Sequence, residues 1–186
     1  MSILVNNAGW GLPCPLDETD YQELEGIINL NIGPYVYLTR SLLPRMLKRE
    51  KRSGIIFNAS FAAEVVLPCH ATYSASKVFV DHFAKCLAFE NPDKIDVLVY
   101  KPNLVESNLV RRKPSFGILS SKEAASSALD KMGWDLETEG HWRHVVVNGR
   151  LKLMRALLPE KMNMRLINQQ LRPIAKIVKA ENRNRP

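Results

Sequence analysis

Short apolar runs alternate along the chain with longer stretches in which apolar residues recur at helical spacing. Four short runs predict buried strands: Ser2–Val5, Gly54–Ala59, Ile95–Tyr100 and His144–Val147. Three longer stretches predict helices: Leu24–Met46, which follows an acidic start at residues 17–20, Tyr73–Phe89, which stops before Pro92, and Ser121–Met132. Strands separated by helices of this length predict an α/β fold, with a four-stranded parallel sheet and helices on both faces.

Composition limits the class of protein further. The chain has 186 residues, of which 46% are apolar and 24% charged, as in one ordinary globular domain. Collagen, disordered tails and disulfide mini-proteins are excluded. We expect neither a membrane-spanning helix, which needs about 18 consecutive apolar residues, nor a signal peptide. The cysteines, Cys14, Cys69 and Cys86, lack metal or redox-motif spacing and are interpreted as free thiols in a reducing compartment.

The net charge of +7 belongs to the end of the chain. Residues 151–186 carry nine Lys and Arg against two acidic residues, so residues 1–150 are neutral overall. We therefore expect a body at 1–150 and a basic helical tail at 151–186. The tail lacks the interleaved aromatics of a nucleic-acid site. Its apolar residues suit either a solvated helix packed on the body, or a helix that lies on an anionic membrane surface or covers a substrate channel.

Three residues suggest chemistry at one edge of the predicted sheet. Tyr73 and Lys77 stand four apart on one helix and so share a face. A nearby ammonium favours the phenolate and lowers the pKa of a tyrosine, which suits general acid or base catalysis. Ser60 follows a parallel strand at its carboxyl end, where open α/β sheets bind ligands.

These residues belong to a larger set of motifs. The set comprises Asn6-Asn7-Ala8-Gly9, Asn31, Ser60, Tyr73-xxx-Lys77 and Pro102-Asn103-Leu104-Val105-Glu106-Ser107. In order and spacing it resembles the NNAG, Asn, Ser, YxxxK and PGxVxT motifs of the short-chain dehydrogenase/reductases. The surrounding sequence is similar to the microsomal branch of 17-beta-hydroxysteroid dehydrogenases and very-long-chain 3-oxoacyl-CoA reductases. The resemblance implies the carboxyl-terminal part of a Rossmann-type doubly wound sheet.

The resemblance also implies roles for individual residues. Tyr73 would exchange the proton with the substrate oxygen, Ser60 would hydrogen-bond that oxygen, and Asn31 would hold a relay water. Lys77 would lower the pKa of Tyr73 and contact the nicotinamide ribose. The remaining contacts with NADP(H) or NAD(H) would come from Asn7, Ala8, Gly9, Pro102, Val105 and Ser107. The implied reaction is reduction of a ketone, or oxidation of an alcohol, on a hydrophobic sterol-like or long-chain acyl substrate. The implied location is the endoplasmic reticulum membrane surface, with the cytoplasm as the alternative.

Two departures from the family pattern qualify this function. Asn103 stands where the family usually has Gly, and the pyrophosphate-binding TGxxxGxG turn does not occur in these residues. We therefore expect an incomplete cofactor site with too little affinity for useful occupancy, so that these 186 residues alone neither bind NADPH tightly nor reduce ketones. We also expect an exposed sheet edge at Ser2–Val5 that needs a partner chain or an amino-terminal half. The chain is then either part of a longer enzyme or a truncated, non-catalytic relative that acts as an assembly component.

Several other features favour structural interpretations. The amides of Asn6 and Asn7 are expected mainly to brace neighbouring strands. The Asn58-Ala59-Ser60 glycosylation match lies at a strand end and is interpreted as accidental. Cys69 is expected to line the substrate pocket rather than act as a nucleophile. His70, His82, His141 and His144 lack metal-ligand spacing and are expected to be surface or packing residues.

Overall fold

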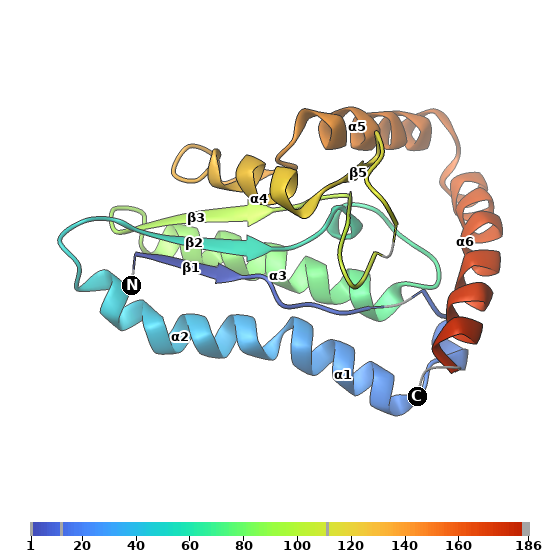
Figure 1. Cartoon of the computed structure of the whole chain (residues 1–186), viewed down its shortest axis with the longest axis horizontal. Helices are drawn as coiled ribbons and strands as arrows, with labels where there is room; N and C mark the ends of the chain where they lie inside the picture. The colour runs from blue at the N-terminus through green and yellow to red at the C-terminus, as the bar shows by residue number, and fades with distance from the viewer. Residues whose placement is uncertain (1, 12, 111, 184–186) are drawn as a thin grey trace.

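The chain folds around a parallel sheet of four strands. The computed structural model describes residues 2–11, 13–110 and 112–183. The strands are β1 (Ile3–Asn6), β2 (Ser53–Asn58), β3 (Ile95–Tyr100) and β6 (Glu137–Thr138), and they lie side by side in that order (Figure 1). Every neighbouring pair is parallel, so all four carboxyl ends meet at one edge. The predicted fold class is confirmed.

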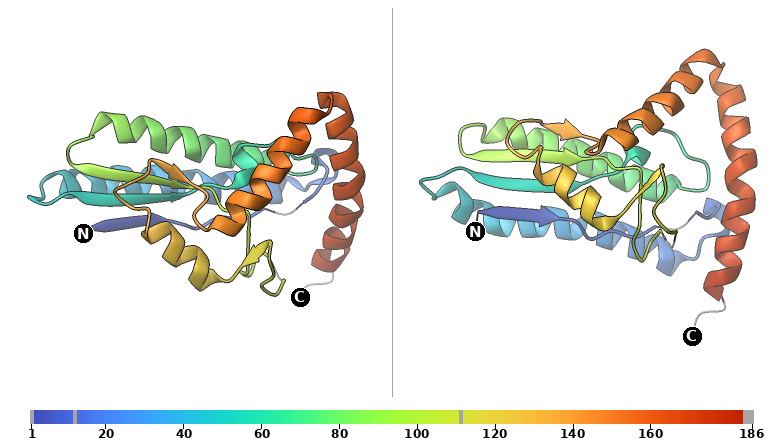
Figure 2. Two further views of the ribbon diagram at one scale, coloured as in Figure 1. Left: turned by 90° about the horizontal axis from the view of Figure 1, so that it is seen from above. Right: turned by 45° about the horizontal axis from the view of Figure 1, so that its top comes forward.

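Successive side chains of the central strands point to opposite faces of the sheet, so each face has its own core. Ile55 and Phe57 pack with Val80 of α3 (Ala71–Glu90), on the face that α2 (Gly33–Leu47) also covers. Ile56 and Leu98 point the other way, towards α4 (Ser121–Leu129). Figure 2 shows α1, α2 and α3 on one side of the sheet and α4 and α5 on the other. Because both faces are covered, these strands are apolar almost throughout.

The first helical stretch is broken into two helices. Asp20 occupies the N-cap position of α1 (Tyr21–Asn31), which agrees with the predicted acidic start. Ile32, at φ −114° and ψ −57°, caps the end of α1 and the start of α2, which begins at Gly33 with Pro34 in its first turn. The single helix expected over residues 24–46 is therefore interrupted directly after Asn31. A short 3-10 turn, η1 (Leu16–Glu18), precedes α1.

The strand predicted over His144–Val147 is wrong. These residues belong to α5 (Trp142–Leu157), in which His144 and Asn148, four apart, are fully buried while Val145 and Val146 face outward. That spacing is helical, and the valine run suggested a strand only because short apolar runs do not distinguish the two structures. The fourth strand is instead β6, which pairs with Val99 and Tyr100.

A small second sheet follows β3. Strand β4 (Leu104–Val105) pairs in parallel with β5 (Ile118–Leu119), directly before α4. The start of α4 is a capping box: the Ser120 hydroxyl accepts from the Glu123 N–H, and the Glu123 carboxylate accepts from the Ser120 N–H. This arrangement fixes the segment that carries the Pro102–Ser107 motif.

The basic tail is helical. Helix α5 continues through residue 150, where the sequence predicts a boundary, and α6 (Glu160–Arg183) follows after a turn. Ala175 is buried on α6, while Met162, Leu166 and Ile177 remain exposed beside basic residues. Figure 1 shows α6 standing across the end of the molecule beyond the carboxyl ends of the strands. Among the described residues, no helix has the length and apolar character needed to cross a bilayer.

Candidate active site

The side chains of Ser60, Tyr73 and Lys77 meet at the carboxyl edge of the sheet. Ser60 follows β2 and begins the turn η2 (Phe61–Ala63), whose Ala62 N–H bonds to the Ser60 hydroxyl at 3.1 Å. Tyr73 and Lys77 lie in the first turns of α3. The Tyr73 hydroxyl lies close enough to Ser60 for that side chain to lower its pKa, and the Lys77 ammonium lies 5.8 Å from the centre of the Tyr73 ring. The three residues thus meet at the edge of the sheet where the sequence analysis expected them.

Burial dominates the electrostatics of Tyr73. Removal from water raises the pKa of its hydroxyl, and the neighbouring Ser60 side chain offsets only part of that rise. The net direction is a rise, and the lowering of this pKa by Lys77 that the resemblance implies stays a prediction. The Lys77 ammonium donates to the Asn58 carbonyl at 2.8 Å and to the Tyr35 hydroxyl at 3.4 Å. Tyr73 is therefore protonated at neutral pH, the form that a general acid needs.

Lys77 is an unusual lysine. Only 3% of its surface is exposed, and burial lowers the pKa of its ammonium to about 8. Tyr35, on α2, is buried beside it, and its hydroxyl donates to the same Asn58 carbonyl at 3.2 Å. Sequence analysis missed Tyr35, although its position four residues after Asn31 was a usable signal.

Asn31 holds the backbone of the NNAG segment in place. Its carbonyl oxygen accepts from the Trp10 N–H at 2.8 Å, and its amide donates to the Trp10 carbonyl and the Ser76 hydroxyl, both at 2.9 Å. Ser76 in turn donates to the Tyr73 carbonyl at 2.7 Å. Asn31 thus connects the loop after β1 to the first turn of α3. The relay role for Asn31 stays a prediction.

The NNAG residues combine bracing with close approach. The Asn6 amide donates to the Thr39 hydroxyl on α2, and the Asn7 side chain accepts from Asn58 at the end of β2. A β-carbon on Gly9 would lie 3.0 Å from the Lys77 ammonium, so glycine leaves the backbone open at this lysine. Ala8, between Asn7 and Gly9, is exposed. The bracing role is seen directly, and the cofactor contacts remain predictions.

The segment after β3 reaches the same edge through Pro102. The carbonyl of this buried proline accepts from the Phe61 N–H at 2.9 Å, next to Ser60. Val105 pairs with Leu119 in the small sheet, and the Ser107 hydroxyl accepts from the Val110 N–H. Pro102 therefore lies next to Ser60. Val105 belongs to the small second sheet, and Ser107 follows it.

Asn103, which replaces the family glycine, is held by α5. Its amide donates to Asn148 at 2.5 Å, its side-chain oxygen accepts from the Leu104 N–H, and its own N–H donates to His144. His144 is fully buried, and its other ring nitrogen donates a hydrogen bond to the Leu104 carbonyl at 3.1 Å. Burial lowers the pKa of this imidazole, so it stays neutral. His144 is thus a packing residue, as expected, with a specific partner.

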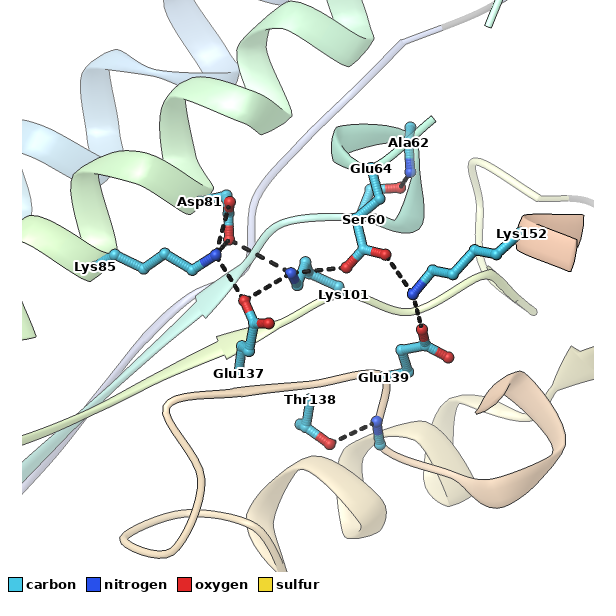
Figure 3. Close-up of polar contacts among 11 residues, drawn as sticks. Ser60, Ala62, Glu64, Asp81, Lys85, Lys101, Glu137, Thr138, Glu139 and Lys152 are labelled. Atoms are coloured by element: carbon cyan, nitrogen blue, oxygen red, sulfur yellow. Dashed lines mark hydrogen bonds and ion pairs between the residues drawn. The ribbon is translucent and has the colours of Figure 1, made fainter. Parts of the chain in front are cut away.

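A charge network lies beside these residues (Figure 3). Lys101, directly before Pro102, is buried and contacts Glu64 at 2.7 Å, Glu137 at 2.8 Å and Asp81 at 3.7 Å. The network continues through Lys85, which also contacts Asp81 and Glu137, and through Lys152, which contacts Glu64 and Glu139. It ties the ends of β2 and β3 to α3, β6 and α5.

The carboxylates hold Lys101 in its charged form. Burial alone would lower the pKa of Lys101, but its bonds to Glu137 and Glu64 raise that pKa overall. In the other direction, Lys101 and then Lys85 lower the pKa of Glu137 to about 2. Sequence reasoning did not identify this network.

Comparison with known proteins agrees with this fold and site. The family model described as short chain dehydrogenase matches residues 1–116. The chain therefore belongs to the short-chain dehydrogenase family. The solved structures that it resembles include the 3-ketoacyl-(acyl-carrier-protein) reductase of Brucella melitensis complexed with NADH, at 28% identity and a TM-score of 0.66 over 73% of this chain and 61% of that one. A short-chain dehydrogenase from Streptomyces avermitilis aligns at 27% identity and a TM-score of 0.67, over 86% of this chain and 68% of that one.

The curated relatives fall in the branch that the sequence indicated. A hydroxysteroid dehydrogenase-like protein 1 from Gallus gallus is 34% identical over 78% of this chain and 46% of its own length. A very-long-chain 3-oxoacyl-CoA reductase from Mus musculus is 30% identical over 90% of this chain and 54% of its own length. The chain thus spans about half the length of these relatives. The predicted family and branch are confirmed.

Proposed function

We propose that this chain carries the catalytic part of a nicotinamide-dependent reductase that converts a ketone on a hydrophobic substrate to an alcohol. The observation that carries the proposal is the convergence of Ser60 and Tyr73 at the carboxyl edge of a parallel sheet, close enough for Ser60 to influence the Tyr73 pKa, with Lys77 beside the Tyr73 ring. Two hydroxyl groups side by side suit a single carbonyl oxygen.

The chemistry follows from the protonation states. The Ser60 hydroxyl donates a hydrogen bond to the substrate oxygen and polarises the carbonyl. Tyr73, protonated because burial raises its pKa, transfers its phenolic proton to that oxygen as negative charge develops there. The Lys77 ammonium, 5.8 Å from the ring centre, stabilises the phenolate that remains.

The residues around Lys77 fit a nicotinamide cofactor. An ammonium has three donors. Two of them are directed at the Asn58 carbonyl and the Tyr35 hydroxyl, which leaves one for a ribose hydroxyl. Gly9 keeps the adjacent backbone free of a side chain. The cofactor, when bound, supplies the hydride. Pro102, Val105 and Ser107 would border its nicotinamide.

The substrate class rests on the relatives. Their names include very-long-chain 3-oxoacyl-CoA reductase and hydroxysteroid dehydrogenase-like protein. The first names a carbonyl and the second a hydroxyl group, each on a large apolar body. We therefore propose a long-chain 3-oxoacyl thioester first, and a sterol-like ketone second.

The test compares two tyrosine variants of the 186-residue chain. NADPH oxidation is followed with a long-chain 3-oxoacyl-CoA at millimolar NADPH, because these residues contain no TGxxxGxG turn and we expect weak cofactor affinity. Tyr73→Phe should lower the rate by roughly 10²-fold or more. Tyr37→Phe, which removes a hydroxyl from an exposed tyrosine on α2, should leave it unchanged. Equal rates for both variants would overturn the proposal.

A second candidate function is an assembly component that uses the edge of the sheet. Within the described chain β1 pairs with β2 alone, and Ile3 and Val5 are 46% and 53% exposed. An exposed apolar edge strand favours pairing with another strand. Absence of NADPH-dependent reduction at millimolar cofactor, together with self-association that Val5→Lys abolishes, would favour this candidate over the reductase.

A further inference from the structure

The main chains of Cys14 and Cys69 are in direct contact beside Tyr73, although 54 residues separate the two cysteines in the sequence. The Cys14 N–H donates to the Cys69 carbonyl at 2.7 Å. A main-chain hydrogen bond of this length leaves the two Cα atoms roughly 5–6 Å apart. Disulfides span Cα separations of about 4.4–6.8 Å. The backbones therefore already stand at disulfide distance, while both thiols are free in this structure.

The two cysteines also share one cavity. Both cysteines line a pocket whose wall includes Ile27, His70 and Tyr73. Both are half-buried. Burial raises the pKa of the Cys69 thiol, so this sulfur is largely protonated at neutral pH.

The backbone at Cys69 is held in an uncommon conformation. Its φ of +65° makes it the one non-glycine residue with positive φ among the described positions. An L-residue other than Asn, Asp or Gly rarely adopts this region and does so at a cost. The turn from Leu67 to His70, closed by a 3.2 Å hydrogen bond, maintains this conformation. Cys69 is therefore fixed in place opposite Cys14.

We propose that Cys14 and Cys69 form a reversible disulfide with a low-molecular-weight disulfide as oxidant. One thiol loses its proton and attacks the small disulfide, which releases one small thiol and leaves a mixed disulfide on the protein. The second protein thiol, after losing its proton, displaces the other small thiol and forms the Cys14–Cys69 bond. Two cysteines are oxidised, one small disulfide is reduced to two thiols, and the two protons pass to those thiols.

The bond would fix the loop that covers Tyr73. A β-carbon on Gly11 would lie 2.8 Å from Cγ of Tyr73, so this backbone rests directly on the ring. Cys14 follows on the same loop, and Cys69 precedes the helix that carries Tyr73. Oxidation would therefore lock the loop after β1 against the start of α3. An effect on turnover rests on the proposed function, whereas formation of the bond does not.

The test uses intact mass. The 186-residue chain is incubated with oxidised glutathione, its remaining thiols are alkylated, and its mass is measured under non-reducing, denaturing conditions. We expect a loss of about 2 Da, one alkylated thiol at Cys86, and full reversal by dithiothreitol. Peptide mapping should link Cys14 to Cys69. The disulfide should also raise Tm by roughly 5–15 °C.

Serine variants supply the matched controls. Cys14→Ser and Cys69→Ser should each abolish the 2 Da loss, while Cys86→Ser, which removes an exposed thiol from α3, should retain it. Three alkylated thiols after oxidation, glutathione adducts without an internal bond, or a bond that includes Cys86 would each overturn the proposal. Because mass is the measurement, failure here is distinct from failure of the reductase assay.

Discussion

Gly11 lies directly against Tyr73. A β-carbon on residue 11 would come within 2.8 Å of Cγ and 2.9 Å of Cβ of the tyrosine, closer than real side-chain contacts allow. The loop after β1 therefore reaches the proposed proton donor through its backbone, which only a residue without a side chain permits.

We predict that Gly11→Ala lowers the free energy of unfolding by about 1–3 kcal/mol, because the added methyl group must displace the ring or the loop. Urea unfolding measures the change. Gly26→Ala, on an exposed turn of α1 with open space around it, should instead add about 0.5–1 kcal/mol. When Tyr73 is also replaced by alanine, the Gly11→Ala substitution should lower the free energy of unfolding much less. An equal loss with and without the Tyr73 ring would contradict the contact.

Lys77 should make the protein more stable as the pH rises. The folded chain releases this proton near pH 8, and the unfolded chain only near pH 10.5. Between these values the unfolded state binds more protons, so stability increases with pH. Lys77 should contribute a gain of about 2 kcal/mol between pH 7 and 9.5. Lys77→Met should remove this gain in urea titrations, and the exposed Lys51→Met should keep it. The same slope in both variants would show that Lys77 titrates normally.

Lys101→Met should destabilise the protein in a pH-dependent way. At pH 7 the substitution leaves Glu64, Asp81 and Glu137 close together without their shared cation, at a cost of about 2–4 kcal/mol. Lys101 is the main cause of the lowered pKa of Glu137, so the stabilisation from this pair is lost as the pH falls and the difference from wild type should shrink at pH 4. Lys131→Met breaks an exposed pair with Asp135 on the chain surface and should cost at most about 0.5 kcal/mol. An equal loss at pH 7 and pH 4 would argue against the network.

Asn103→Gly restores the usual family residue and should nonetheless destabilise this chain. The change removes the bond to Asn148, whose side chain is fully buried, and the bond from the Leu104 N–H. We expect a loss of about 1–2 kcal/mol in thermal or urea unfolding. Asn103→Ala, which lacks the backbone freedom of glycine, should lose a similar amount. Greater stability in either variant would show that the family glycine is preferred here too.

The sequence predicted those parts of the fold that local pattern encodes. Residues 95–100 were placed correctly because a six-residue run with five apolar residues, between Asn91-Pro92 and Pro102, has few alternatives. The strand Glu137–Thr138 was missed because it is short and polar, and it forms only by pairing with Val99 and Tyr100. Pairing partners distant in sequence leave no local signal.

The same contrast holds at the site. Ser60, Tyr73 and Lys77 were identified because spacing and strand position place them together. The Lys101 network was not identified, because its charged residues lie on or beside β3, α3, β6 and α5. In the sequence each of them looks like a solvated side chain. Burial raises the pKa of Tyr73, and residue spacing does not reveal burial.

The parallel register sets the order in which the sheet can be assembled. Ile3 pairs with Gly54, and Ser53 pairs with Ile95, so each strand pair closes only after a long helical crossover has been made. Such distant pairings cost loop-closure entropy before they gain contacts, and they slow folding. We therefore expect helical signal to precede sheet formation in refolding. Until β2 pairs with it, β1 leaves its apolar residues uncovered, and that interval is when a chaperone would be needed most.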